Sequence, residues 1–174
     1  MLGSLIFLVI IIFLIASLFL QKNSVSQISF LPNKNINKIA AGLYLTDFEN
    51  AKDYEYLKQL GVCQILTIGR ELPRHGDMFF KTMHIPLDDS PTEDIKKYFN
   101  STYNFINRGS TVVHCAAGIS RSVTIVAAYL MRKFKISADK AILHISKCRN
   151  IINPNQGFRS QLKQFEKELE PQEN

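Results

Sequence analysis

Residues 114–122, with the sequence HCAAGISRS, constrain the fold of this chain more than any other segment. An apolar β-type run at Thr111–His114 precedes the segment, and an apolar helical run that starts near Ser122 follows it. Cys115 and Arg121 therefore lie on a small-residue loop between a strand and a helix N-terminus. The amides of such a loop and the dipole of the helix bind anions. A thiol at the base of this loop indicates chemistry on a phosphate group.

Strand-like and helix-like segments alternate through the rest of the chain. We expect strands at residues 43–45, 62–68, 83–87 and 111–114, and helices at 53–60, 90–107, 122–133, 137–148 and 156–169. Ser90, Pro91 and Glu93 form a capping pattern, which predicts that the second of these helices starts there. The alternation predicts an α/β fold with a mainly parallel central sheet and helices on both faces. Ligands bind such sheets at the carboxyl ends of the strands, where residues 115–121 fall.

The N-terminus differs in composition from the rest of the chain. Residues 2–20 are apolar and uncharged, and as a helix they would span roughly 28 Å, about one bilayer core. We expect one transmembrane helix at residues 1–21, a polar linker at 22–37, the folded domain at 38–170 and a tail at 171–174. A cleaved signal peptide is the alternative, although no Lys or Arg precedes the apolar run.

The charges also predict an orientation for this single-pass anchor. Every Lys and Arg of the chain follows the apolar run, so the positive-inside rule places the folded domain in the cytosol. The cysteines, Cys63, Cys115 and Cys148, form no evenly paired set, which agrees with a reducing compartment. Both arguments favour a membrane protein with its folded domain on the cytosolic side.

Composition narrows the choice of partners. The net charge of +6 and the sequence pI of about 9.3 suit anionic partners. No basic block with interleaved aromatic residues is present, so we expect no nucleic-acid partner. The Cys and His residues lack the spacing of a zinc site, so we expect no metal.

The loop residues suit a nucleophilic attack on phosphorus. A helix N-terminus and a nearby guanidinium favour the thiolate of Cys115, which is the nucleophilic form. The planar fork of Arg121 can bind two phosphoryl oxygens at once, and the hydroxyl of Ser122 can hydrogen-bond the sulfur when it leaves. The expected phosphate-binding backbone amides are those of Ala116, Ala117, Gly118, Ile119, Ser120 and Arg121. Because these groups supply the electrostatic stabilisation, we expect no cofactor.

The motif resembles that of a known family. The pattern HCxxGxxRS resembles the signature of the protein tyrosine phosphatase superfamily, and AGISRS followed by AYLM at residues 128–131 resembles the dual-specificity phosphatases. The likeness extends to AGLYL at 41–45, IPLDD at 85–89 and PN at 154–155. It implies a protein tyrosine phosphatase-like fold. It also implies hydrolysis of phosphotyrosine and phosphoserine or phosphothreonine on proteins, through a cysteinyl-phosphate intermediate.

The resemblance also implies roles for residues outside the loop. The family needs a general acid before the signature, and its spacing after Pro86 selects Asp89 over the neighbouring Asp88. Asn155 resembles the asparagine that hydrogen-bonds the active-site loop, although it could also be a plain turn residue. His114 is expected to orient the loop and to modulate the cysteine.

Two other functions fit the same motif less well. A phospholipid phosphatase would suit a membrane anchor, but the loop interior has no lysine for extra phosphates on a headgroup. A phosphopeptide-binding module would be expected to have lost Cys115, Arg121 or Asp89, and all three are present. Cys63 is expected to be a small core residue, with a redox partnership with Cys115 as the alternative.

Overall fold

A computed structural model of the protein describes residues 35–170. The predicted anchor at residues 1–21 and the first part of the predicted linker lie outside this range. Among residues 35–170, no helix combines the length and the hydropathy that a membrane span requires. The first strand begins at Asn37, so the last residues of the predicted linker are part of the folded structure.

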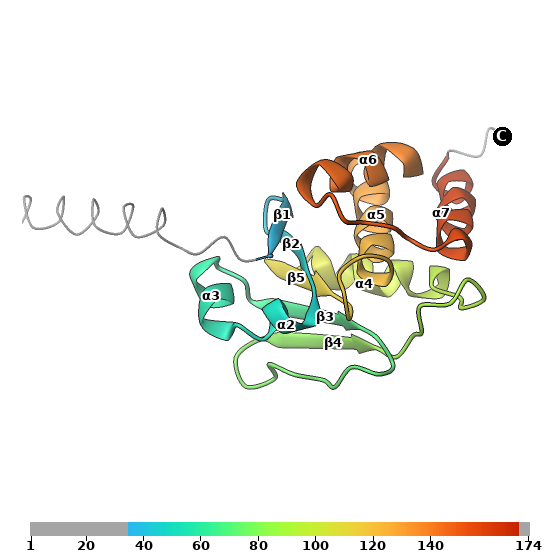
Figure 1. The fold of residues 1–174 in the computed structure, drawn as a ribbon. Helices are drawn as coiled ribbons and strands as arrows, with labels where there is room; N and C mark the ends of the chain where they lie inside the picture. The colour runs from blue at the N-terminus through green and yellow to red at the C-terminus, as the bar shows by residue number, and fades with distance from the viewer. Residues whose placement is uncertain (1–34, 171–174) are drawn as a thin grey trace, which may run out of the picture. The chain divides into compact units, whose positions relative to one another are not determined.

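The described residues form a five-stranded sheet with the order β1-β2-β5-β3-β4 (Figure 1). The strands are β1 (Asn37–Ala40), β2 (Leu43–Thr46), β3 (Gln64–Ile68), β4 (Lys81–Ile85) and β5 (Thr111–His114). β1 runs antiparallel to β2, and the other neighbouring strands pair in parallel. The predicted α/β fold with a mainly parallel sheet is confirmed.

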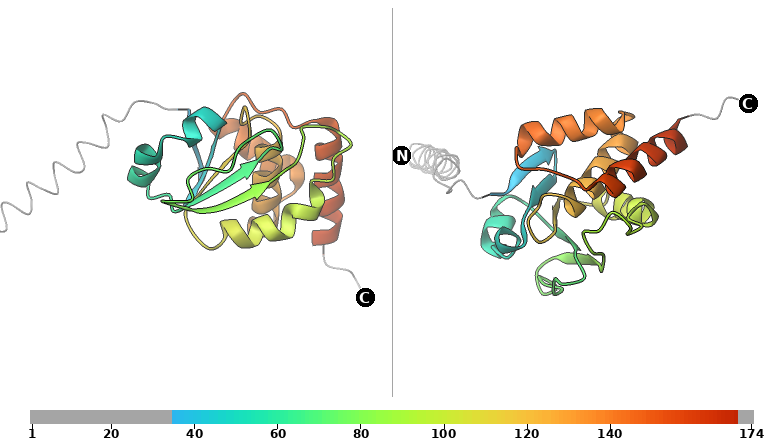
Figure 2. Two further views of the ribbon diagram at one scale, coloured as in Figure 1. Left: turned by 90° about the horizontal axis from the view of Figure 1, so that it is seen from below. Right: turned by 45° about the vertical axis from the view of Figure 1, so that its right-hand side comes forward.

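Helices cover both faces of this sheet, but unequally. The helices are α2 (Phe48–Ala51), α3 (Tyr54–Gln59), α4 (Phe99–Ile106), α5 (Arg121–Phe134), α6 (Ala138–Cys148) and α7 (Gln156–Leu169), with a 3-10 turn η1 (Lys96–Tyr98) directly before α4. α4 to α7 gather on one face, and the short α3 packs on the other (Figures 1 and 2). The two faces therefore have cores of different size.

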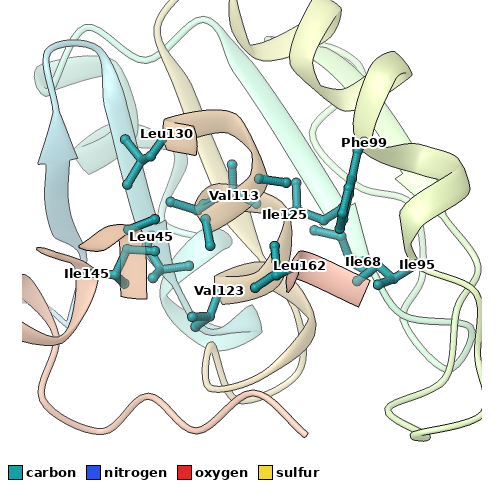
Figure 3. Close-up of a cluster of buried hydrophobic side chains, with 14 of the residues drawn as sticks. Leu45, Ile68, Ile95, Phe99, Val113, Val123, Ile125, Leu130, Ile145 and Leu162 are labelled. Atoms are coloured by element: carbon teal, nitrogen blue, oxygen red, sulfur yellow. The ribbon is translucent and has the colours of Figure 1, made fainter. Parts of the chain in front are cut away.

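Alternate strand residues supply these two cores, as the two-residue period of a strand requires. In β5, Val113 belongs to the large cluster under α4 to α7, and Val112 belongs to the small cluster under α3. The large cluster includes Ile125 and Leu130 from α5, which is surrounded by other elements (Figure 3). Each fully buried aliphatic side chain of this kind contributes about 1.5–3 kcal/mol. The large core thus holds α5, and with it the end of the signature loop, against the sheet.

Strand register brings three carboxyl ends to one edge of the sheet. Thr46 at the end of β2 and Thr67 near the end of β3 both pair with His114, the last residue of β5. Cys115 follows directly, so the signature loop lies at the carboxyl edge between two neighbouring strands. This is the place where an open parallel sheet binds ligands.

The helix predicted to start at Ser90 starts later, and this prediction was wrong. The chain forms a turn at residues 90–93, and regular helical structure begins with η1 at Lys96. The Glu93 carboxylate accepts a hydrogen bond from Arg70, which lies in the turn that follows β3. The side chain of Gln161 donates to the Glu93 carbonyl and accepts from the Lys96 amide. Contacts with α7 therefore replace the local cap that the sequence pattern suggested.

Candidate active site

Cys115 and Ser122 lie together at the base of the signature loop. Cys115 is 2% exposed, and its Sγ lies 3.2 Å from the Ser122 Oγ. α5 begins at Arg121, so the positive end of its dipole lies beside the sulfur. A hydroxyl and a helix N-terminus in these positions stabilise negative charge on the sulfur.

The backbone of the loop directs its carbonyl groups into the surrounding protein. The Ala116 carbonyl accepts a hydrogen bond from the Phe48 amide at 3.1 Å, and the Ile119 carbonyl accepts one from the Asn153 amide at 2.9 Å. In a trans peptide unit the N–H points opposite to the C=O. Within the described part of the chain, the amides of residues 116–120 have no hydrogen-bond acceptor. These amides are therefore available to an anion.

Arg149 supports the loop from behind and was not predicted from the sequence. It is 2% exposed, and it donates to the Gly118 carbonyl at 2.8 Å and to the Ala117 carbonyl at 3.1 Å. The same guanidinium donates to the side-chain oxygens of Asn35 and Asn37. Burial lowers the pKa of Arg149, and the negative charges of Asp47 and then of Cys115 partly oppose this shift. One buried cation thus joins α6, the loop and the start of β1.

Gly118 allows the loop to pass close to β2. Its φ is +67°, in the left-handed region that favours glycine. A Cβ at this position would lie 2.4 Å from the Thr46 carbonyl oxygen. The glycine of the motif is therefore required by both the backbone conformation and the close approach of a strand.

Arg121 is 5% exposed, and its guanidinium is held by two elements outside the loop. Nη1 donates to the Glu71 Oε2 at 2.9 Å and to the Leu87 carbonyl at 3.2 Å, and Nη2 donates to the Glu71 Oε1 at 2.7 Å. Burial acts to lower the pKa of Arg121, but hydrogen bonding to Glu71 and the negative charges around it raise the pKa overall. The same hydrogen bonds lower the pKa of Glu71. The arginine is thus a fixed cation beside Cys115.

Asp89, and not Asp88, faces the signature loop. The Asp89 Oδ1 accepts hydrogen bonds from the Ser120 Oγ at 2.7 Å and from the Asn155 Nδ2 at 2.8 Å. Its Oδ2 lies 3.9 Å from the Arg121 Nε. Asp88 instead pairs with Arg70 at 3.0 Å on the exposed side of the segment. The structure therefore separates the two neighbouring carboxylates and places Asp89 beside Arg121.

Asn155 joins α7 to both Asp89 and the loop. It is the N-cap of α7, and its Oδ1 accepts a hydrogen bond from the Phe158 amide at 2.9 Å. The backbone N–H of Asn155 donates to the Ser120 Oγ at 3.2 Å. The predicted loop contact is present, and the side chain also reaches Asp89, which the sequence did not predict. Asn155 does not lie in a turn, as the alternative expected, but caps α7 in an extended conformation.

Comparison with known proteins agrees with this arrangement. The family described as "Dual specificity phosphatase, catalytic domain" matches residues 43–168. Dual specificity protein phosphatase 1-B of Xenopus laevis is 38% identical over 132 residues, which cover 73% of this chain and 36% of the relative. Dual specificity protein phosphatase 1B of Arabidopsis thaliana is 37% identical over 144 residues, covering 79% of this chain and 85% of the relative. This chain therefore spans about a third of the Xenopus relative but most of the plant one.

Solved structures show the same fold. The structure of a mouse putative dual specificity phosphatase complexed with zinc tungstate has a TM-score of 0.74 and 28% identity, covering 80% of this chain and 91% of that one. The chain belongs to the dual specificity phosphatase family. The resemblance predicted from the signature is confirmed at the level of the family and of the fold.

His114 of this dual specificity phosphatase domain is a neutral, buried imidazole. Its Nε2 lies 2.8 Å from the Thr67 Oγ1 and 2.9 Å from the His75 Nε2. Burial lowers the pKa of His114 to about 3, and the positive charge that His75 can carry adds to the shift. His114 Nδ1 lies 3.4 Å from the Cys115 carbonyl oxygen. The ring of His114 therefore contacts the backbone of Cys115, and its orienting role stays a prediction.

Cys63 of the phosphatase domain lies away from the loop. Cys63 precedes β3, and its Sγ donates to the Ser110 carbonyl, at the strand edge opposite Cys115. Cys63 is exposed, so the expectation that it is a core residue was wrong. The strand register also gives no support to a disulfide between Cys63 and Cys115. Within residues 35–170, no group of three or more His, Cys, Asp or Glu side chains could hold a metal ion.

Three supporting residues were missed by sequence reasoning. Glu71, His75 and Arg149 each contact a residue of the phosphatase signature from a distant part of the chain. None of them lies in a recognisable motif. The sequence signal for these residues was only a charged side chain or an imidazole, without an assigned role, near the end of a predicted strand or helix. Their roles follow from tertiary contacts alone.

Proposed function

We propose that this chain is a cysteine-dependent phosphatase that hydrolyses phosphotyrosine and phosphoserine or phosphothreonine on proteins. The supporting observation is the convergence of three groups at one sheet edge. The Cys115 thiol, the Arg121 guanidinium and the free amides of residues 116–120 surround one position for a phosphoryl group. Asp89 lies beside the arginine and can reach the leaving oxygen. No single one of these groups would suffice for the reaction.

The first step transfers the phosphoryl group to sulfur. The Cys115 thiolate attacks phosphorus, an S–P bond forms, and the P–O bond to the leaving group breaks. Protonated Asp89 gives its proton to the leaving oxygen. Both hydrogen bonds from the protein reach its Oδ1, which leaves Oδ2, the oxygen nearer to Arg121, to transfer the proton.

The second step hydrolyses the cysteinyl phosphate. Asp89, now a carboxylate, takes a proton from a water molecule, and the water oxygen attacks phosphorus. The S–P bond breaks and the sulfur leaves as a thiolate, to which the Ser122 hydroxyl can donate a hydrogen bond. Arg121 and the loop amides stabilise the charge on the phosphoryl oxygens in both steps. Inorganic phosphate is released and the enzyme returns to its starting state.

The loop favours a protein substrate over a highly charged lipid headgroup. Ala116 and Ala117 are the exposed loop residues, and neither carries a charge that could bind a second phosphate. Tungstate, which accompanies the mouse relative, is a tetrahedral oxyanion of the same kind as a single phosphate. One phosphoryl group on a peptide side chain therefore fits this loop best. A phospholipid with a single phosphate is the second candidate.

Hydrolysis of p-nitrophenyl phosphate by the full-length chain in detergent tests the reaction. We expect turnover by the wild type and none by Cys115→Ser. Absence of turnover by the wild type, or equal turnover by Cys115→Ser, would exclude a cysteine-dependent phosphatase. The substrate class is tested with phosphopeptides and with vesicles that contain phosphatidic acid. A higher kcat/KM on the vesicles would favour the lipid.

We also propose that residues 1–21 anchor the protein in a membrane with the catalytic domain in the cytosol. The support is the uncharged apolar run and the position of every basic residue after it. A tagged full-length chain should remain in the membrane fraction after carbonate extraction and keep its N-terminal residues. Recovery of a shortened, soluble protein would instead indicate a cleaved signal peptide.

A further inference from the structure

The hydrogen bonds of Arg121 leave one defined edge of its guanidinium free. A guanidinium has five N–H groups: one on Nε and two on each Nη. Nη1 donates to Glu71 and to the Leu87 carbonyl, and Nη2 donates once, to Glu71. The two remaining N–H groups, on Nε and Nη2, lie on the same side of the planar group. They form the bidentate edge that a phosphoryl group can bind.

The free edge is buried and directed at the site. Among the described residues, Arg121 Nε is the buried side-chain nitrogen or oxygen that has no hydrogen-bond partner. The nearest carboxylate oxygen is the Asp89 Oδ2, at 3.9 Å, which is too long for a hydrogen bond. An unpaired buried N–H is costly in a folded protein. This atom is therefore satisfied when a ligand oxygen occupies the position beside Asp89.

Glu71 determines which edge of the arginine is free. Its two carboxylate oxygens bind Nη1 and Nη2 end-on, so rotation of the guanidinium would break both bonds. Glu71 follows β3 in a turn where the Leu72 amide bonds the Gly69 carbonyl. The Glu71 Oε2 lies 3.0 Å from the place where a Cβ on Gly69 would stand. The glycine thus lets the carboxylate fold back toward the site.

We propose that Glu71 is a positioning residue of the phosphatase reaction, which holds Arg121 with its Nε and Nη2 edge toward the phosphoryl group. This inference rests on the proposed function and adds a residue outside the signature and outside the acid segment. A phosphoryl group binds the side of the guanidinium that Glu71 leaves open. Substrate therefore does not have to displace Glu71, although both are anions.

The neighbouring residue offers a matched control. Arg70 pairs with Asp88 at 3.0 Å, in an exposed ion pair that does not touch Arg121. Asp88→Asn therefore removes one carboxylate charge at a similar place without disturbing the guanidinium. Exposed pairs of this kind contribute little to stability. The control separates the loss of a local charge from the loss of orientation.

Steady-state kinetics of the full-length chain on p-nitrophenyl phosphate test the proposal. Glu71→Gln presents an amide NH₂ to a guanidinium N–H, so one bond is lost and the arginine can turn. We expect kcat/KM to fall by about 30-fold, mostly in kcat, because misplacement of a catalytic group by about 1 Å costs as much as 10²-fold. Glu71→Asp keeps two acceptor oxygens and should recover part of the loss. Asp88→Asn should stay within about twofold of the wild type.

Phosphate binding provides a readout that does not need turnover. Inorganic phosphate should protect Cys115 of the wild type against iodoacetamide, and Glu71→Gln should need several-fold more phosphate for the same protection. Tighter phosphate binding or faster turnover in Glu71→Gln would show that Glu71 competes with substrate, and would overturn the proposal. Equal losses in Glu71→Gln and Asp88→Asn would overturn it too. If the wild type does not hydrolyse p-nitrophenyl phosphate but phosphate still protects its Cys115, the proposed function fails. The comparison of protection between the wild type and Glu71→Gln would still test the role of Glu71.

Discussion

The two sides of the proposed site, a nucleophile side at Cys115 and an acid side at Asp89, are built in different ways. On the nucleophile side, Cys115, the loop amides and Arg121 are contiguous in sequence and lie between β5 and α5. On the acid side, Asp89 is fixed by Ser120 and by Asn155, which is 66 residues away. A contiguous motif can be recognised from sequence. When distant segments hold the acid in place, the sequence can only favour one candidate, Asp89, over its neighbour Asp88. Mutations on the two sides are also expected to lower activity by different amounts.

The largest effect is expected on the nucleophile side, at Arg121. Arg121→Lys keeps the positive charge but removes the planar fork and both bonds to Glu71. We expect kcat/KM on p-nitrophenyl phosphate to fall by about 10³-fold, equal to about 4 kcal/mol. A loss below about tenfold would show that charge suffices and that the fork geometry has no special role.

A smaller effect, on stability, is expected where the contiguous loop depends on a distant residue. Arg149→Met removes the donors to both carbonyls, and so leaves the buried Gly118 carbonyl and the partly buried Ala117 carbonyl without those partners. We expect the free energy of unfolding to fall by about 3 kcal/mol. Urea denaturation would measure it, with Lys147→Met on the exposed face of α6 as the control. An unchanged midpoint for Arg149→Met would mean that the loop supports itself.

Next in size is the acid side. Asp89→Asn removes the transferable proton but keeps an acceptor for Ser120 and Asn155. We expect kcat to fall by about 10²-fold, or about 2.7 kcal/mol, because general acid–base catalysis contributes at least that much. The loss should shrink for an aryl phosphate with a better leaving group. Asp88→Asn should change kcat by about twofold or less, since its pair with Arg70 is exposed. Similar losses in both variants would mean that the acid is misassigned.

The same contrast explains which elements the sequence predicted. α7 (Gln156–Leu169) and α6 (Ala138–Cys148) match the predicted ranges, because Asn155 and Ser137 cap them locally. The loop with its strand and helix was predictable for the same reason. The helix expected at Ser90 was displaced by contacts with α7. A Cβ at Gly157 would lie 1.9 Å from the Pro91 carbonyl oxygen, so this segment packs directly against the first turn of α7.

Elements without a local signal could not be predicted. β1 (Asn37–Ala40) is short, and its pairing with β2 follows from a turn at Gly42, whose φ is +69°. Glu71 and Arg149 are charged residues whose partners are 50 and about 31 residues away. Local sequence carries no information on such pairs. The site could be located from its nucleophile, but its supports required the fold.

His114 shares features of both sides of the site. It belongs to the contiguous motif, yet Thr67 and His75 hold its ring. The charged or titratable groups that act on it are His75 and His84, which lower its pKa, and Asp47, which raises it. Burial is the dominant cause of the low pKa. Its neutrality is therefore a property of the fold, and it can be measured as a dependence of stability on pH.

The smallest predicted effect is the fall in the free energy of unfolding at acidic pH. The pKa of His114 is about 3 in the folded protein, well below the ordinary value of 6.5 for a histidine, so between these values the unfolded chain binds one more proton. The contribution of His114 to stability is then constant above about pH 7.5 and falls by up to about 1.4 kcal/mol for each pH unit below 6.5. His114→Asn should reduce this slope, whatever its absolute stability, whereas His144→Asn on α6 should leave it unchanged. Part of the slope remains in His114→Asn because burial also lowers the pKa of His75. Urea midpoints between pH 7.5 and 5 measure both slopes. Parallel slopes for His114→Asn and the wild type would mean that the ring takes up its proton in the folded state, and that Thr67 and His75 do not keep the imidazole beside the nucleophile neutral.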